Sequence, residues 1–210
     1  KAMTTGADNT AFGLSAGAAI TTGSRNIAIG GVALDNVDSE NDNLAIGYAA
    51  LGGAIAGGEF NVAIGNYSMD DLTSGDYNTA VGYNSLTGNT TGNNNTAAGY
   101  NALSSGAGSD NTAFGFEAVQ VTSGSNNTGV GFRSINNVES ADNNTALGHR
   151  AGDVITTGAN NIIIGQGSDP SGAAGANQIV IGTGATGHGD NIVVIGNGSA
   201  TAIHPHDDNE

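Results

Sequence analysis

Side chains suited to acid–base, nucleophilic or metal chemistry are sparse in this chain of 210 residues. It contains four histidines and no cysteine, which excludes disulfides, zinc–thiolate sites and a cysteine nucleophile. Serine and aspartate are frequent, but no serine-hydrolase elbow, phosphate-binding loop or zinc-protease motif occurs. Two Gly-x-Gly sequences, at 165–167 and 196–198, have no helix signal after them and are expected to be turns. We therefore predict that the chain is not an enzyme.

The best candidate for a transition-metal site is the His-x-His pair formed by His204 and His206. If three chains brought this pair to a common axis, six imidazoles would form an octahedral nitrogen set that suits iron or another transition metal. The alternatives are a disordered polar terminus and a junction into a further domain. The other two histidines, His149 and His188, are expected to be turn residues rather than metal ligands.

Four aspartates stand directly before a recurring asparagine and are candidates for calcium binding between coils or chains: Asp8, Asp42, Asp110 and Asp190. Carboxylate oxygens are the hard ligands that Ca²⁺ prefers. However, the nine-residue Gly-Gly-x-Gly-x-Asp calcium repeat is missing. We therefore expect these groups to be solvated turn carboxylates.

The overall charge argues against polyanionic partners. The formal net charge is −15 with only four Lys and Arg residues, so we predict no nucleic-acid binding, because phosphate contacts need clustered cations. The acidity suits solubility or adaptation to a saline habitat. No apolar run approaches the roughly 18 residues of a membrane span, so we expect no membrane insertion of this segment.

A short repeat organises the whole chain. The motif is Asn, any residue, usually Ala, an apolar residue and Gly, and it occurs twelve times. Successive copies follow at an almost constant interval of about seventeen positions, and only the last interval, from Gly182 to Gly196, is clearly shorter. The repeated glycines are Gly13, Gly30, Gly47, Gly65, Gly82, Gly99, Gly115, Gly131, Gly148, Gly165, Gly182 and Gly196.

This period predicts an all-β solenoid. Such a unit is too short for a helix pair or a propeller blade, but it suits one coil made of two short strands and two turns. With 36 glycines and only ten Phe and Tyr residues, the chain favours a long thin core. We expect residues 1–200 to form one elongated repeat domain and residues 201–210 a polar tail, tip or junction.

The triplet after each asparagine, such as Ile27-Ala28-Ile29, is the expected strand. Its outer two residues must face one way and its middle residue the other. Because the middle residue is usually Ala, we expect that face to lie against another copy of the rod, which predicts a homo-oligomer. The recurring threonine at the first position shares its place with Ile27 and Val62, so we expect this column to face inward.

The recurring asparagine is expected to form a hydrogen-bonded structural ladder, because equivalent amides in stacked coils lie about 4.8 Å apart. Gln178 keeps an amide at the one place where asparagine is missing. A row of ligand-binding amides is the functional alternative. The ladder residues are Asn9, Asn26, Asn43, Asn61, Asn78, Asn95, Asn111, Asn127, Asn144, Asn161 and Asn191.

Segments such as Asn26–Gly30, Asn61–Gly65 and residues 191–200 resemble the YadA-like head repeats of trimeric autotransporter adhesins. The Asn-Thr-Ala-x-Gly-Tyr version with its Thr-Thr-Gly-Asn-Asn linker, at 78–103, is similar to repeats of phage tail-fibre proteins. This resemblance implies a left-handed parallel β-roll of about twelve coils in a side-by-side homotrimer. Head repeats of that family are usually shorter, and only the last interval, between Gly182 and Gly196, matches them.

The resemblance implies a structural and adhesive fibre segment, either extracellular at a cell surface or on a virion tail fibre. Its expected partners are copies of itself and a cell-surface glycan or protein receptor. An ice-binding β-solenoid is the alternative from another class, since such folds can present threonine ladders. A fibre-borne polysaccharide depolymerase is a third alternative, which would need paired carboxylates in a groove.

Overall fold

The computed structural model describes residues 5–53, 57–106, 108–120 and 123–199. The described chain forms a parallel sheet of twelve strands, each three residues long, in sequential order. The strands are β1 (Thr10–Phe12), β2 (Ile27–Ile29), β3 (Leu44–Ile46), β4 (Val62–Ile64), β5 (Thr79–Val81), β6 (Thr96–Ala98), β7 (Thr112–Phe114), β8 (Thr128–Val130), β9 (Thr145–Leu147), β10 (Ile162–Ile164), β11 (Ile179–Ile181) and β12 (Val193–Ile195).

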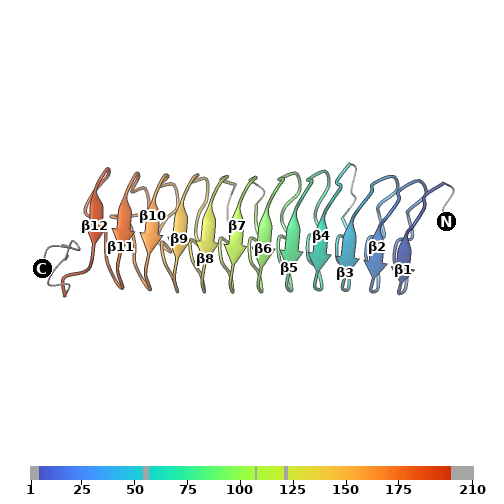
Figure 1. Ribbon diagram of the computed structural model, residues 1–210, viewed down its shortest axis with the longest axis horizontal. Helices are drawn as coiled ribbons and strands as arrows, with labels where there is room; N and C mark the ends of the chain where they lie inside the picture. Colours follow the sequence, from blue (N-terminus) through green and yellow to red (C-terminus); the bar gives the residue numbers. More distant parts are fainter. Residues whose placement is uncertain (1–4, 54–56, 107, 121–122, 200–210) are drawn as a thin grey trace, which may run out of the picture.

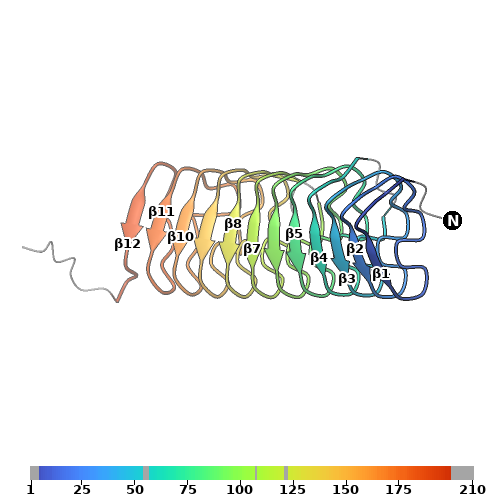
Figure 2. The same ribbon diagram turned by 45° about the vertical axis from the view of Figure 1, so that its right-hand side comes forward.

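The coils stack into a straight rod with β1 at one end and β12 at the other (Figure 1). The strands follow one another in a single band along this rod (Figure 2). Every strand pairs in parallel with the next one, and equivalent residues face each other, as Ala80 faces Ala97. The predicted β-solenoid is therefore confirmed. Its regularity follows from the constant period, because each coil brings the same residue type above its counterpart.

The interior of the rod is filled by the middle residues of strands β2 to β11 and by buried turn residues such as Leu86 and Leu103. Ala28, Ala63 and Ala97 are fully buried inside the coil, so the expectation that this small residue faces another copy was wrong. The interior is narrow because one short coil must close around it. At β8 the middle residue is Gly129, where an added Cβ would collide with the Val119 side chain and Ser134 Oγ.

The wall opposite the sheet was expected to be a second strand, and this was also wrong. Among the described residues each coil contributes one strand, and the Tyr-x-Ser/Ala-Leu segment is a turn. Alternate residues have positive φ, as at Asn84 (52°) and Leu86 (55°). The turns still stack, because Asn84 N–H donates to Asn66 O of the preceding coil and Leu86 N–H to Ala102 O of the next.

The glycine that ends each strand turns the chain away from the sheet. Gly82 has a φ of 142°, which is accessible mainly to glycine. An added Cβ there would also meet the carbonyl oxygen of Gly99 in the next coil. Both the backbone conformation and the close stacking therefore require glycine, which explains why this position anchors the repeat.

Within the described residues, no helix has the length and apolar character needed to cross a membrane.

Candidate interaction surfaces and polar ladders

The asparagine ladder is a continuous set of hydrogen bonds inside one edge of the rod. Asn95 N–H donates to Asn78 Oδ1 (2.9 Å), and Asn95 Nδ2 donates to Gly108 O across the turn (2.9 Å). The same backbone-to-side-chain bond joins successive members from Asn9 to Asn161 and ends on Gln178 N–H. The ladder residues from Asn26 to Asn161 are buried. Their amides satisfy backbone groups of the turn, which is a structural use.

Asn191 does not belong to this ladder. The pairing of Ile179 with Val193 places Ile192, not Asn191, beside Gln178. Asn191 is exposed and accepts a hydrogen bond from Asn177 Nδ2 on the outer turn (2.7 Å). The physical reason is one extra residue between the asparagine and the strand in the last copy. Gln178 closes the ladder, and its side chain turns to Ser171 instead.

A second ladder was not anticipated from the sequence. It lies two residues before the asparagine ladder and runs in the opposite direction. Asp76 N–H donates to Asn93 Oδ1 of the next coil (2.8 Å), and Asn93 N–H donates to Ser109 Oγ (3.1 Å). The signal was present, because this column is rich in Asn, Asp and Ser.

Three of the four carboxylates considered for calcium have protein partners, and the fourth, Asp8, acts electrostatically on Arg25. Asp42 pairs with Arg25 (2.6 Å), and this hydrogen bond lowers the pKa of Asp42. Asp110 accepts from Asn94 Nδ2, and Asp190 accepts from Ala176 N–H. Throughout the part of the chain that is described, no three His, Cys, Asp or Glu side chains come close enough to hold a metal ion.

The four histidines differ in their positions and contacts. The pair His204 and His206 lies outside the described residues, so the axial metal site stays a prediction. His149 stacks on Phe132 with ring centroids 5.0 Å apart, so its imidazole packs as a flat ring against its neighbour. His188 lines a cavity at the C-terminal end of the rod.

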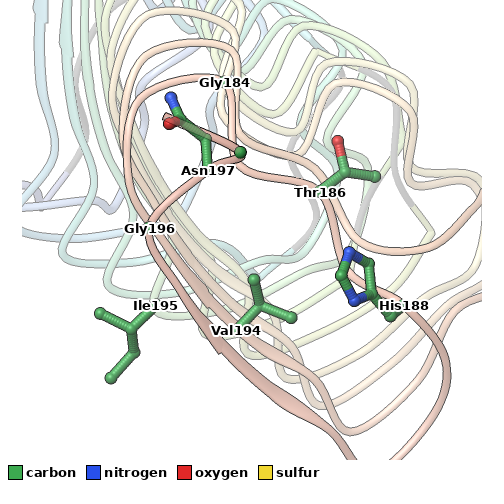
Figure 3. Close-up of a pocket in the computed structure, with 8 residues that line it drawn as sticks. Gly184, Thr186, His188, Val194, Ile195, Gly196 and Asn197 are labelled. Carbon is green, nitrogen blue, oxygen red and sulfur yellow. The ribbon is translucent and has the colours of Figure 1, made fainter. Parts of the chain in front are cut away.

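This end cavity has a volume of about 400 Å³ (Figure 3). Its lining includes Val194, the middle residue of β12, which is half-buried among the described residues. The lining is completed by residues that include Thr186, His188 and Asn197, and it contains no carboxylate. In Figure 3 Val194 lies inside the loop of the chain, whereas Ile195 points away from it. The cavity thus lies at the C-terminal end of the thin core formed by the described residues.

Three aspartates on the turn wall have pKa values raised chiefly by burial. The pKa of Asp70 rises to about 6 through burial and the neighbouring charge of Asp71. The pKa of Asp169 rises through burial and the charge of Asp153, and that of Asp35 through burial. One oxygen each of Asp70 and Asp169 is buried without a hydrogen-bond partner among the described residues.

The first and third residues of the strands point away from the core and form what we call the outer sheet face. The expectation that the threonine column faces inward was therefore wrong. Its threonines are only partly covered or exposed, and Phe12 (78%), Phe114 (61%) and Val193 (59%) leave most of their surface in solvent. The face runs along the length of the rod with the band of strands (Figure 2).

Beside the outer sheet face runs an aromatic ladder, which we define as the ring series from Tyr48 to His149. Its later members, Tyr83, Tyr100, Phe116, Phe132 and His149, stack face to face at 5.0–5.6 Å. Tyr67 comes from the adjacent column and therefore meets Tyr48 and Tyr83 edge-on. The ladder follows from the ring that comes directly after the strand-ending glycine in six coils between Tyr48 and His149.

A scan against protein-family models and a search of curated proteins return no match for this chain. The resemblance to adhesin head repeats and tail-fibre repeats therefore stays a prediction.

Proposed function

We propose that this chain is a structural and adhesive segment of a trimeric fibre, borne on a cell surface or a virion, that attaches to a cell surface. Three identical rods lie side by side, each coiled as a left-handed β-roll. The repeat supplies length and stiffness, and the residues that vary between coils supply recognition.

The outer sheet face carries this proposal. Its third column is apolar in all twelve strands, with no polar residue from Phe12 to Ile195. Apolar patches of this extent mark contact surfaces, because leaving them in water costs about 25 cal/mol for each Å². A second copy of the rod presents the same column with the same spacing. Two parallel rods can therefore pair their apolar columns along the whole length, because the spacing of the coils is the same in both.

The molar mass in solution tests the oligomeric state. Light scattering is expected to give about three times the chain mass of 20.5 kDa. Phe114→Glu combined with Leu147→Glu places charges on the outer sheet face and is expected to yield monomers or aggregates. Thr157→Glu adds a charge on an exposed turn elsewhere and should leave the trimer intact. A stable monomer of the unchanged protein contradicts the proposal.

Ice binding is retained as a second candidate because the threonine column faces outward. Thr79, Thr96, Thr112, Thr128 and Thr145 occupy successive strands, at a spacing of about 4.8 Å. Against it, the neighbouring third column alternates small Ala98 with bulky Phe114, which disturbs the flatness that an ice surface needs. Thermal hysteresis of the purified protein decides between the two, and its absence removes this candidate.

A fibre-borne depolymerase is favoured by one observation, the interacting carboxylates of Asp153 and Asp169 on neighbouring coils. General acid catalysis uses a carboxyl group with a raised pKa, as burial produces at Asp169. Release of reducing ends from bacterial polysaccharides is the readout. Retention of that activity by Asp169→Asn would exclude this pair as the catalytic site.

A further inference from the structure

The residues directly before the asparagine ladder form an exposed column in which the backbone is left-handed. We call it the outer turn column, and its φ values lie between 52° and 61°. Asparagine and aspartate tolerate this region because their short side chains bond locally. Most members are of these types: Asp8, Asp42, Asn94, Asp110, Asn126, Asn143, Asn160, Asn177 and Asn191.

Two consecutive members of this column are aromatic instead. Phe60 has a φ of 58° and Tyr77 a φ of 57°. Bulky residues with positive φ also occur on the opposite wall, as at Leu86 and Ile135, but those two side chains are buried in the core. The turn would be less strained with asparagine, as in several other coils, so its own stability does not explain the two rings.

The two rings form a parallel stacked pair that stands out from the rod. Their centroids are 5.0 Å apart with an interplanar angle of 2°. Phe60 is 43% exposed and Tyr77 is 59% exposed. Their neighbours along the column are the short side chains of Asp42 and Asn94, which are bonded to Arg25 and Asp110. The stack therefore ends after two rings, whereas interior members of the aromatic ladder have a ring on both sides.

Each ring directly follows a carboxylate residue in the chain. Glu59 and Asp76 directly precede Phe60 and Tyr77 in the chain and are half-buried. Glu59 Oε1 accepts from Asn41 Nδ2 (2.7 Å), and Asp76 Oδ1 accepts from Glu59 N–H (2.8 Å). Their second carboxylate oxygens have no hydrogen bond within the described residues. In each carboxylate, one oxygen is held by a hydrogen bond and the other can accept a hydrogen bond from a ligand.

We propose that the patch of Phe60, Tyr77, Glu59 and Asp76 binds an uncharged saccharide unit. The C–H-lined face of a pyranose packs on an aromatic ring, and its hydroxyl groups donate to carboxylate oxygens. Acidic sugars are excluded by charge, since Arg25, the cation in this column, is paired with Asp42. Three copies of the patch on a trimer would strengthen a weak single contact through avidity.

This inference rests on the proposed attachment function and names its ligand. The probes are neutral hexasaccharides of glucose, mannose and galactose, with hexagalacturonate as the acidic comparison. Calorimetry and saturation-transfer NMR on the unchanged protein are expected to show binding of at least one neutral probe, with transfer from the Tyr77 ring. The double variant Phe60→Asn, Tyr77→Asn is expected to lose at least tenfold in affinity.

Two controls separate recognition from a structural role. Tyr83→Asn removes a ring from the aromatic ladder, in a column where Asn66 already occurs, and should leave binding unchanged. Because asparagine suits the outer turn column, the double variant should unfold at the same temperature as the parent or higher. A lower unfolding temperature with unchanged binding would show that the pair is structural and would overturn the inference.

The remaining outcomes distinguish failure of the saccharide site from failure of the trimeric fibre. If no neutral probe binds, or hexagalacturonate alone binds, the saccharide site is refuted even where light scattering shows a trimer. If the protein is a monomer but a neutral probe binds through Tyr77, the trimeric fibre fails while the site stands. The oligomeric state and the saccharide site can therefore fail separately.

Discussion

At the scale of single residues, the strand-ending glycines carry the strictest requirement in the chain. Gly82 combines a φ of 142° with a position against the Gly99 carbonyl, so any side chain meets both backbone strain and a steric clash. Neither problem can be relieved by a rotamer change, because both involve Cβ and the backbone of the adjacent coil.

Gly82→Ala is expected to lower the free energy of unfolding by about 3 kcal/mol or more. Urea denaturation followed by circular dichroism measures the effect. Gly172→Ala is the matched control, because an added Cβ there meets no atom within 4 Å. Equal destabilisation by the two variants would contradict the steric explanation.

Asp70 predicts a pH dependence of stability. Its folded pKa of about 6 exceeds its ordinary value of 3.8, so the folded state holds the proton more tightly than the unfolded state. This contribution is fully present below pH 3.8 and is lost as the pH rises through about 6. Asp70→Asn should therefore match the parent near pH 3.5 and be more stable at pH 7.5.

Urea midpoints at these two pH values test the role of Asp70. Asp110→Asn makes the same change of charge in the outer turn column, where asparagine is common, and should leave the pH profile parallel to that of the parent. An unchanged profile for Asp70→Asn would refute the assignment to Asp70.

At the scale of elements, backbone hydrogen bonds between stacked turns take the place of a second β-sheet, and side-chain ladders join the turns that precede the strands. Strands of three residues give few hydrogen bonds, and the turns before the strands are joined by the asparagine ladder and, in part of the rod, by the second ladder of opposite direction. The side-chain amides thereby pair backbone groups that a turn would otherwise leave unsatisfied. This explains why asparagine recurs even where the strand sequence varies.

Asn95→Ala removes the acceptor for Asn111 N–H and the donor to Gly108 O inside the rod. Leaving these buried groups unpaired should cost about 2–4 kcal/mol of unfolding free energy. Asn126→Asp changes an exposed amide of the outer turn column and should stay within about 0.5 kcal/mol of the parent. Thermal and urea unfolding measure the stability of both variants. An equally small loss of stability in Asn95→Ala would contradict a stabilising role of the ladder.

At the scale of the whole molecule, the rod is a one-dimensional stack in which each coil contacts its neighbours along the axis. In such an array stability is approximately a sum of unit and nearest-neighbour contributions. Length can therefore change by whole coils without changing the fold.

Deletion of residues 79–95 joins Asn78 to Thr96 and removes one complete coil. The shortened protein should keep its circular dichroism spectrum and unfold cooperatively at a slightly lower temperature. Deletion of residues 79–87 removes about half a coil, puts the ladders out of register and should prevent folding of the rod. Similar behaviour of the two deletions would contradict the stacked-coil account.

The sequence predicted the period, the positions of the twelve strands and most of the asparagine ladder for one physical reason. Coils that stack in register place equivalent residues in the same environment. The same types of residue are therefore required once in every coil, which gives the sequence its period. Exceptions arose where the spacing changes, as at Asn191, whose copy contains one extra residue before the strand.

Which side of each strand faces the core could be decided only by the tertiary structure. Alternation along Ile27-Ala28-Ile29 defines two faces but does not say which is inside, because both are apolar. Closure of the coil turns the middle residue inward, where it packs with buried turn residues such as Leu86, and this turns the threonine column outward. The pairing of Phe60 with Tyr77 is likewise a product of stacking, since one whole coil of chain separates two rings whose centroids lie 5.0 Å apart.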